Sequence, residues 1–313
     1  MSSVAVIVAT RNRPAELSAC LTSLAGQSLP ADRVVVVDDD PANARTAAVV
    51  ASFAGVRYLA GGSLGLAAAH NAGLRATSSD ILAFTDDDVV ADQDWLRSLV
   101  TGFDGPGVGC VTGQIQPLEL ATDAQRLLEA YARFDKGDAR RVFDLEGHRP
   151  PGSLFPFAVG AVGSGANMAF TRRALDDIGW FDPALGAGTR AAGGDDLSAF
   201  FEVLLRGYRI VYEPTAVVHH RHAREMSSLR RQVYGYGVGL TAYLTRTLLA
   251  HPRLGPRALR GVPAALRHIL GSASAKNRTL PPGYPARLRW AERAGMLVGP
   301  VAYLASRLER RQT

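Results

Sequence analysis

The segment that decides the fold is residues 81–89, Ile-Leu-Ala-Phe-Thr-Asp-Asp-Asp-Val, an apolar run that ends in three consecutive acids. Such a run predicts a buried strand. Alternate residues of an extended chain face the same side, so Asp86 and Asp88 can converge on one cation. Adjacent carboxylates repel one another, and hard oxygen ligands suit Mg²⁺ or Mn²⁺, with phosphate oxygens completing the coordination. A solvated acidic loop is the alternative.

The sequence before this segment alternates between strand and helix patterns. Short apolar runs at residues 4–9, 34–37 and 56–59 predict buried strands, and residues 44–53 and 65–76 predict helices. This alternation indicates an α/β fold, with a parallel sheet covered by helices on both faces. Ligands bind such sheets at the carboxyl ends of the strands, where the acidic clusters fall.

The pattern beyond residue 105 is mixed. Residues 208–212 and 216–219 predict two short strands, residues 135–152 predict a charged loop, and everything after residue 224 predicts helices.

Basic residues are concentrated at the end of the chain. Residues 1–219 contain 18 Lys and Arg against 26 Asp and Glu, whereas residues 220–313 contain 17 against 3. We therefore expect a catalytic domain at 1–222 and a basic helical extension at 223–313. The extension could contact an anionic membrane surface, pack on the catalytic domain, or form a solvated helical surface.

The overall composition is that of a globular protein. The chain has 313 residues, 47% of them hydrophobic, and a mean hydropathy of +0.02. Its first residues enter a strand at once, which leaves no room for a cleavable signal, and Cys20 and Cys110 lack metal-ligand spacing. We expect a protein of the cytoplasm, free or held at the inner face of the membrane, with no nucleic acid among its partners.

An ordered set of motifs resembles those of family-2 glycosyltransferases of the GT-A fold, across residues 3–222. The motifs are VAVIVATRNRP at 4–14, VVVDD at 35–39, a glycine at 65 leading to NAG at 71–73, DDD at 86–88, GWFD at 179–182, DD at 195–196 and EPTAVVHHRH at 213–222. His70 stands where the family has arginine, and Asp195 where it has glutamate, which leaves the donor geometry open. The resemblance implies a GT-A (Rossmann-like), mixed, mostly parallel sheet flanked by helices, with a helical C-terminal extension.

The resemblance also implies an activity. Such an enzyme moves one hexosyl group from a nucleoside-diphosphate sugar to an acceptor hydroxyl with inversion, assisted by Mg²⁺ or Mn²⁺. The signature and membrane helices of processive polysaccharide synthases are missing from the sequence, which favours transfer of a single sugar. The acceptor is a glycan, a lipid-linked or a small molecule, and its specificity is expected in residues 135–157 and in the extension.

Donor contacts are expected at the ends of the first four strands and at the start of the helix at 65–76. The nucleotide-binding candidates are Thr10, Arg11, Asp38, Asp39, Gly65, Asn71, Asp86 and Asp87. Asp39 or Asp38 could accept the imide N–H of a pyrimidine or guanine base, which favours UDP, with dTDP or GDP as alternatives. An acidic helix cap is the competing interpretation of this acidic run, and Arg11 could equally be a surface residue.

The chemistry is expected at Asp86, Asp88, Asp195, Asp196 and His220. Inverting transfer needs a carboxylate that deprotonates the acceptor hydroxyl, and we assign that role to Asp196, with Asp195 orienting the acceptor. Simple helix capping by the pair is the alternative. His220 aligns with the histidine of the family and joins Asp86 and Asp88 as the predicted third metal ligand. It could instead hold the diphosphate or a loop.

The sugar and acceptor side is expected to include Gly165, Asn167 and Trp180. Gly165 and Asn167 lie in a glycine-rich stretch whose backbone N–H groups could cradle the sugar or diphosphate. Trp180 could contact the acceptor, although a place in the core is equally consistent with its sequence. The glycine-rich residues 186–194 predict a loop able to close over the donor.

Two other classes of protein remain as alternatives. A nucleotidyltransferase on a related sheet predicts a glycine-rich loop with Arg and Lys after the first strand, where this chain has Ala-Thr-Arg-Asn-Arg at 9–13. A non-catalytic carbohydrate- or membrane-binding protein would be expected to lack Asp196 or the Asp86 and Asp88 pair, all of which are present.

Overall fold

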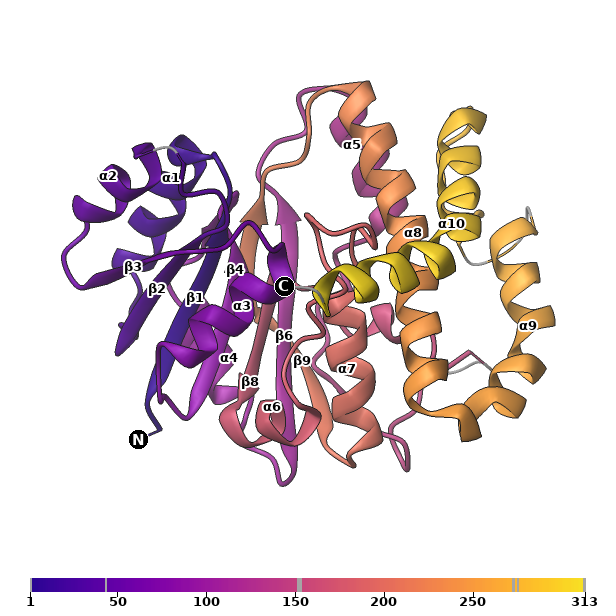
Figure 1. The fold of residues 1–313 in the computed structure, drawn as a ribbon, viewed down its shortest axis with the longest axis horizontal. Helices are drawn as coiled ribbons and strands as arrows, with labels where there is room; N and C mark the ends of the chain where they lie inside the picture. Colours follow the sequence, from indigo (N-terminus) through magenta and orange to yellow (C-terminus); the bar gives the residue numbers. More distant parts are fainter. Residues whose placement is uncertain (1, 43, 151–153, 272–273, 275, 312–313) are drawn as a thin grey trace.

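A nine-stranded sheet forms the centre of the computed structural model, which describes residues 2–42, 44–150, 154–271, 274 and 276–311 (Figure 1). The strands are β1 (Val4–Thr10), β2 (Arg33–Asp38), β3 (Val56–Ala60), β4 (Ile81–Asp86), β5 (Val89–Ala91), β6 (Val108–Pro117), β7 (Arg141–Phe143), β8 (Asn167–Thr171) and β9 (Arg209–His220). Their order is β3-β2-β1-β4-β8-β6-β9-β5, with β7 paired to β9. β1 to β4 are parallel, as are β6 and β9, and the antiparallel β8 joins these two halves. The predicted α/β class and mixed sheet are confirmed.

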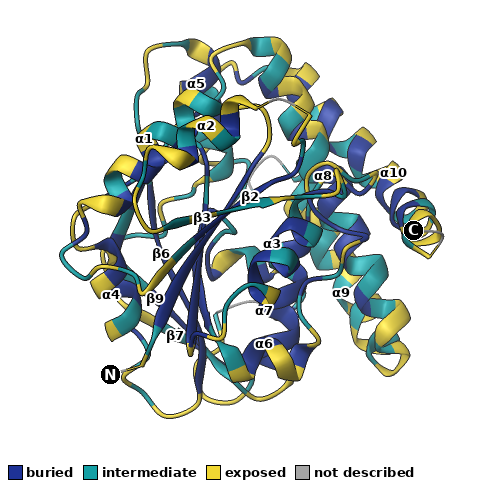
Figure 2. Ribbon diagram, turned by 60° about the vertical axis from the view of Figure 1, so that its left-hand side comes forward, coloured by how far each residue is buried: buried dark blue, intermediate teal, exposed yellow. Residues whose placement is uncertain are grey.

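Helices cover both faces of this sheet. They are α1 (Pro14–Ala25), α2 (Arg45–Ala51), α3 (Leu66–Arg75), α4 (Trp95–Thr101), α5 (Asp123–Ala132), α6 (Arg172–Ile178), α7 (Asp195–Leu205), α8 (Met226–Ala250), α9 (Gly255–Leu270) and α10 (Ala286–Arg310), with short 3₁₀ turns at Val159–Ala161 and Pro252–Leu254. The apolar sides of α1, α2 and α4 pack on one face, and those of α3, α6 and α7 on the other. The central strands β1, β4, β8 and β6 are therefore mostly buried, whereas the edge strand β3 is not (Figure 2).

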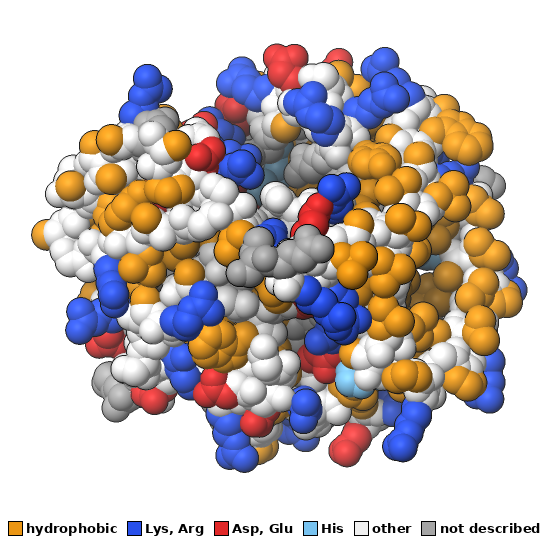
Figure 3. Space-filling model, in the orientation of Figure 1, with side chains coloured by type: hydrophobic (Ala, Val, Ile, Leu, Met, Phe, Trp, Pro, Cys, Tyr) orange, Lys and Arg blue, Asp and Glu red, His pale blue; other side chains and the backbone are white. Residues whose placement is uncertain are grey.

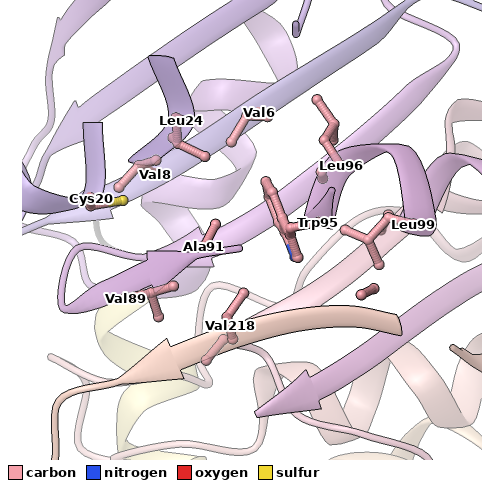
Figure 4. Packing of buried hydrophobic residues seen from close by; sticks show 14 of the residues in the cluster. Val6, Val8, Cys20, Leu24, Val89, Ala91, Trp95, Leu96, Leu99 and Val218 are labelled. Carbon is pink, nitrogen blue, oxygen red and sulfur yellow. The ribbon is translucent and has the colours of Figure 1, made fainter. Parts of the chain in front are cut away.

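The core follows the two-residue period of the strands. In β1, Val4, Val6 and Val8 contribute to the cluster under α1 and α4, while Ala5 and Ile7 contribute to the opposite cluster. Figure 4 shows the first cluster, in which the fully buried indole of Trp95 lies among aliphatic side chains from α1, α4, β5 and β9. This packing fixes the strand ends, and with them the acidic clusters, relative to one another.

Two sequence predictions about the second half of the chain are wrong. Residues 209–212 and 216–219 belong to the single strand β9, which is interrupted by a register shift where Glu213 pairs Gly113 and Val217 pairs Gln114. Pro214 lies in this irregular stretch and gives it the sequence pattern of a loop. The predicted loop at 135–152 contains β7, and its residues 151 and 152 lie outside the described part of the chain.

The helices that follow residue 224 pack on the rest of the protein. α8 lies beside α7, and α10 runs along α8. Tyr303 donates to Asp182 at 2.9 Å, and Arg310 donates to the carbonyl oxygens of Leu64 and Pro183. Among the described residues, no helix is long and apolar enough to cross a membrane. The boundary between residues 222 and 223 stays a prediction.

Candidate active site

The first functional cluster lies where β4 ends. Asp86 is the last residue of β4, and Val89 of the following β5 pairs with His220, the last residue of β9. This pairing brings Asp86, Asp88 and His220 together, with their ligand atoms within 4.8 Å of one another. The His220 Nε2 atom is 3.3 Å from Asp88 Oδ1 and 3.9 Å from Asp86 Oδ2. The pairing of β5 with β9 therefore brings His220 to Asp86 and Asp88, which are neighbours in the sequence.

The middle aspartate of this cluster points the other way. Asp87 is buried and accepts a hydrogen bond from Thr10 Oγ1 at 2.8 Å. Arg13 donates to Asp87 at 3.1 Å and to Asp88 at 2.7 Å. Burial opposes the charge on the Arg13 guanidinium, but Asp87 and Asp88 raise its pKa above the usual value. Thr10 and Arg13 thus fix the cluster and neutralise part of its charge.

The cluster fits a divalent cation. Burial, reinforced by Asp88 and Asp87, raises the pKa of Asp86 well above its ordinary value, and burial raises the pKa of Asp87 to about 6. Asp88 Oδ1 is buried without a hydrogen-bond partner. Two carboxylates and one imidazole match the ligand preference of Mn²⁺ closely and that of Mg²⁺ in part. A cation bound by Asp86, Asp88 and His220 would supply the positive charge that compensates the aspartates.

A hydrogen-bonded chain supports His220 from behind. His220 Nδ1 lies 3.1 Å from His222 Nδ1, and His222 Nε2 lies 2.8 Å from Glu129 Oε2. If His222 donates to Glu129, its Nδ1 in the neutral ring accepts the proton of His220 Nδ1. The Nε2 atom of a neutral His220 then carries a lone pair directed at the cluster. Burial lowers the pKa of His220, which favours this neutral form.

The second functional pair opens α7. Asp196 Oδ2 accepts from the Gly165 backbone N–H at 2.9 Å, and Asp196 Oδ1 accepts from that of Leu197 at 2.7 Å. A Cβ at Gly165 would lie 3.2 Å from the Asp196 Cβ, so a glycine permits this close approach. Burial raises the pKa of Asp196, although these hydrogen bonds oppose the shift. Asp196 is thus held in one orientation while its affinity for a proton is increased.

Asp195 lies deeper than Asp196. Burial and the adjacent Asp196 raise the pKa of Asp195 to about 7. Its Oδ2 is 3.9 Å from Nδ1 of His70, whose own pKa burial lowers to about 3. Both ring nitrogens of His70 are buried without hydrogen-bond partners. The neutral His70 therefore cannot offset the Asp195 charge in the way that an arginine at that position would.

The acidic run after β2 is bonded differently. Asp38 is fully buried, with its carboxylate accepting from Tyr58 Oη and the Asp40 N–H, both at 3.1 Å. Asp39 accepts from the backbone N–H groups of Leu64 at 2.9 Å and Gly65 at 3.1 Å. Asp38 therefore has no exposed surface for a nucleotide, and we assign it a structural role. Asp39 stays the candidate for the base contact.

Gly65 and Arg11 lie beside Asp39. Gly65 has a φ of +86° at the start of α3, and its Cα approaches the backbone of Gly188. A Cβ at Gly188 would lie 3.6 Å from Arg11 Nη1 and 3.7 Å from Asp39 Oδ2. The glycine-rich segment 186–194 therefore lies against this end of the sheet. An antiparallel β-bridge between Gly186 and Gly193 closes this segment.

Two predicted site residues, Asn71 and Asn167, complete core networks, and Trp180 lies elsewhere on the molecule. The Asn71 amide donates to the Phe181 carbonyl at 2.8 Å and accepts from the Phe181 N–H at 3.1 Å. Asn167 is fully buried and bonds the carbonyl oxygens of Gln114 and Ala216 and the Trp95 indole. Trp180 lies beside Arg75, at the end of α3 remote from Gly65. Buried amides must be satisfied, and the partners of Asn71 and Asn167 are groups far away in the sequence.

Four residues near the site escaped the sequence prediction. Arg13, which looked like a helix-start residue, contacts the acidic cluster, and His222 and Glu129 support His220. Burial raises the pKa of Tyr236 on α8, and the charges of Asp196, Asp86 and Asp88 add to this shift. The only sequence signal for any of them was the alternation of His220 and His222 in one strand.

Comparisons with known proteins agree with this geometry. Over 236 residues the chain is 29% identical to a pre-mycofactocin glycosyltransferase of Mycobacterium tuberculosis (strain ATCC 25618 / H37Rv), covering 74% of this chain and 46% of that protein. Over 121 residues it is 35% identical to a validoxylamine A glucosyltransferase of Streptomyces hygroscopicus subsp. limoneus, covering 35% of this chain and 27% of that protein. The chain thus spans less than half the length of these curated relatives.

A solved structure shares the fold. The mannosyltransferase PcManGT from Pyrobaculum calidifontis, in complex with GDP-Man and Mn²⁺, superimposes with a TM-score of 0.59 at 21% identity, covering all of this chain and 81% of that one. The predicted GT-A architecture is confirmed. The model of the family described as glycosyl transferase family 2 matches residues 5–179, more than half of the chain. The chain therefore belongs to glycosyl transferase family 2.

Proposed function

We propose that the protein transfers a single sugar from a nucleoside-diphosphate sugar to an acceptor hydroxyl, with inversion at the anomeric carbon. The observation that carries the proposal is the convergence of Asp86, Asp88 and His220, whose ligand atoms lie within 4.8 Å of one another. The family supplies the reaction class. The complex of the mannosyltransferase with GDP-Man and Mn²⁺ supports a nucleotide-sugar donor.

The donor is proposed to lie across the carboxyl ends of β1, β2 and β4. Asp39 would accept the imide N–H of the base, and Arg11 would face the base or a phosphate. UDP is the preferred nucleotide, with dTDP or GDP as alternatives. The Gly65 N–H is already bonded to Asp39, so in this arrangement it orients the base contact.

Asp196 is proposed as the general base. Its two backbone hydrogen bonds hold the carboxylate in place, and its raised pKa makes it a better proton acceptor than an exposed aspartate. Asp195, behind it, would orient the acceptor.

Asp86, Asp88 and His220 would hold Mn²⁺ or Mg²⁺. When bound, the ion stabilises the negative charge that grows on the leaving diphosphate. Thr10 and Arg13 hold Asp87 and Asp88 in position, and the His222–Glu129 chain orients the His220 ring.

Substitution of Asp196 by Asn tests the proposal. Hydrolysis of UDP-, dTDP- and GDP-sugars in the presence of Mn²⁺ serves as the probe, because it needs no acceptor. We expect Asp196→Asn to bind the nucleotide within about twofold of the wild type but to lose about 10²–10⁴-fold in donor hydrolysis. Unchanged hydrolysis would exclude Asp196 as the base. Absence of any metal-dependent nucleotide binding in the wild type would exclude the donor site.

A further inference from the structure

The inner face of α10 is locked onto α8 through glycines. A Cβ at Gly295 or Gly299 would collide with the α8 backbone, at Tyr234 and Val238 respectively. This arrangement of small residues four apart lets two helices approach closely. Because one face of α10 is fixed against α8, the opposite face is directed outward.

That outward face of α10 is apolar along its length. Trp290, Leu297, Val301, Leu304 and Leu308 are all exposed, Leu297 by 83% and Val301 by 69%. Their spacing of seven, four, three and four residues places them on one side of the helix. The outward side of a helix on a water-soluble domain is normally polar, so a partner for this face is expected.

The neighbouring helix α9 repeats the pattern. All residues of α9 are described and none is buried. Leu259, Val262, Leu266 and Leu270 form an exposed stripe, with Leu259 exposed by 72%. Figure 3 shows hydrophobic side chains crowding the part of this face where α9 and α10 lie, with Lys and Arg side chains around the margin. The two stripes thus contribute to one extended apolar surface.

The charge beside the two stripes has one sign. Residues 220–313 contain 17 Lys and Arg but 3 Asp and Glu. On α9, Arg260 and Arg267 flank the apolar stripe, and on α10, Arg293 lies 5.5 Å from the centre of the Trp290 ring. Long cationic side chains beside apolar ones, with an indole among them, are the composition of helices that lie in the interface of an anionic bilayer.

We propose that α9 and α10 bind the surface of an anionic lipid bilayer, with their apolar stripes inserted among the acyl chains and their arginines at the phosphate level. The outer stripe of α10 runs from Trp290 to Leu308, with Pro300 between its two halves, and covers about 27 Å along the helix, which is long enough for a surface-lying contact. In Figure 3 a hollow with histidine at its floor opens on the same face, next to the apolar area. The inference stands on the two helices and does not require the proposed transfer activity.

Vesicle binding of the full chain tests this proposal. The probes are vesicles of phosphatidylcholine alone and vesicles with added phosphatidylglycerol, at low and high salt. We expect the chain to float with the anionic vesicles and to be released by salt. Replacing Leu297, Val301 and Leu304 together by Ser removes three exposed side chains without touching the α8 contact, and should weaken vesicle binding about 100-fold.

Two matched variants complete the experiment. Leu120→Ser changes a leucine outside the extension whose exposure is close to that of Leu304, and should leave vesicle binding unchanged. The double variant Arg260→Gln and Arg267→Gln should bind anionic vesicles less tightly at low salt. The binding that persists at high salt should be unchanged. Nucleotide binding in the same samples shows whether the donor site is intact, so a failure of membrane binding and a failure of the transfer proposal are separate results.

Three outcomes would overturn the proposal. The wild type could stay unbound at low salt, or the triple variant could bind vesicles as well as the wild type. Light scattering could instead reveal a dimer that the triple variant converts to a monomer, with no vesicle binding by either protein. The last result would make a second copy of the chain the occupant of this surface.

Discussion

Two runs of three aspartates end β2 and β4, the two strands that flank β1, and the protein uses them in opposite ways. Asp38 and Asp39 are satisfied by a tyrosine hydroxyl and by backbone N–H groups. Asp86 and Asp88 face each other and a histidine, and Asp88 keeps a buried oxygen without a partner. The difference shows that three acids at a strand end do not by themselves make a cation site. The local supply of hydrogen-bond donors decides whether they do.

The largest expected effect comes from making the same substitution, Asp to Asn, in each of the two aspartate runs. Asp88→Asn should lower donor hydrolysis about 10³-fold or more and remove the metal dependence of nucleotide binding, because a ligand charge is lost. Asp40→Asn, at the half-exposed end of the other run, should change hydrolysis less than about twofold. Steady-state kinetics and calorimetry with Mn²⁺ measure both. Equal losses in the two variants would remove the distinction between the runs.

The support of His220 should have the next largest effect. His222→Phe breaks the chain from His220 to Glu129, and loss of such a supporting hydrogen bond typically costs 10–100-fold in metal affinity. We therefore expect a decrease of about this size in Mn²⁺ affinity, measured by electron paramagnetic resonance. Glu129→Gln keeps an oxygen that accepts from His222 and should retain most of the affinity. A folded His222→Phe protein with wild-type Mn²⁺ affinity would refute this role.

In EDTA, the free energy of unfolding should depend on pH because of Asp87, in the aspartate run at the end of β4. Asp87 has a pKa of about 6 in the folded protein, above its value in the unfolded chain, so the folded state binds more protons between these values. The free energy of unfolding should therefore fall as pH rises through about 6, by on the order of 2 kcal/mol, and Mn²⁺ should restore it. Urea unfolding at several pH values measures this. Asp87→Asn should flatten the dependence, and Asp40→Asn should leave it unchanged.

The smallest expected effect distinguishes two hydrogen bonds, one donated by the Tyr58 hydroxyl to Asp38 and one donated by the Thr10 hydroxyl to Asp87. Tyr58→Phe removes the bond to Asp38 and should cost about 1–2 kcal/mol in the free energy of unfolding without altering Mn²⁺ affinity. Thr10→Val removes the bond to Asp87 and should alter Mn²⁺ affinity as well. Chemical unfolding and Mn²⁺ titration of both variants test this. A change of Mn²⁺ affinity in Tyr58→Phe would show that the two runs are coupled.

Much of the fold followed from local sequence patterns. The apolar runs of β1, β2 and β4 are buried on both faces, so each appears as an uninterrupted hydrophobic segment. The family motifs then gave the sheet type and placed Asp86, Asp88 and His220. The sequence pattern divides β9 wrongly because Pro214 and its neighbours look like a turn, whereas pairing with β6 on both sides of them keeps the chain in one strand. Short elements such as β5, β7 and α4 have too few residues to show a period.

The errors at the site have a common physical cause. Asn71 bonds Phe181 across 110 positions of sequence, and Asn167 bonds groups 49, 53 and 72 positions away. Whether a polar side chain faces a ligand or completes a core network depends on such distant partners, which local patterns do not contain. Arg13 shows the reverse case, since a residue typical of an exposed helix start is drawn to the acidic cluster by charge.

The bond from Arg310 to the Leu64 carbonyl has a thermodynamic consequence. Leu64 also donates to Asp39, so the last turn of α10 and the nucleotide side of the sheet share one short loop. Where binding at one place moves this loop, the two binding events are linked, and linkage is reciprocal. Any factor by which a bilayer strengthens nucleotide binding equals the factor by which the nucleotide strengthens binding to the bilayer. When that factor exceeds one, a donor-loaded molecule binds the surface more tightly than one that has released its nucleotide.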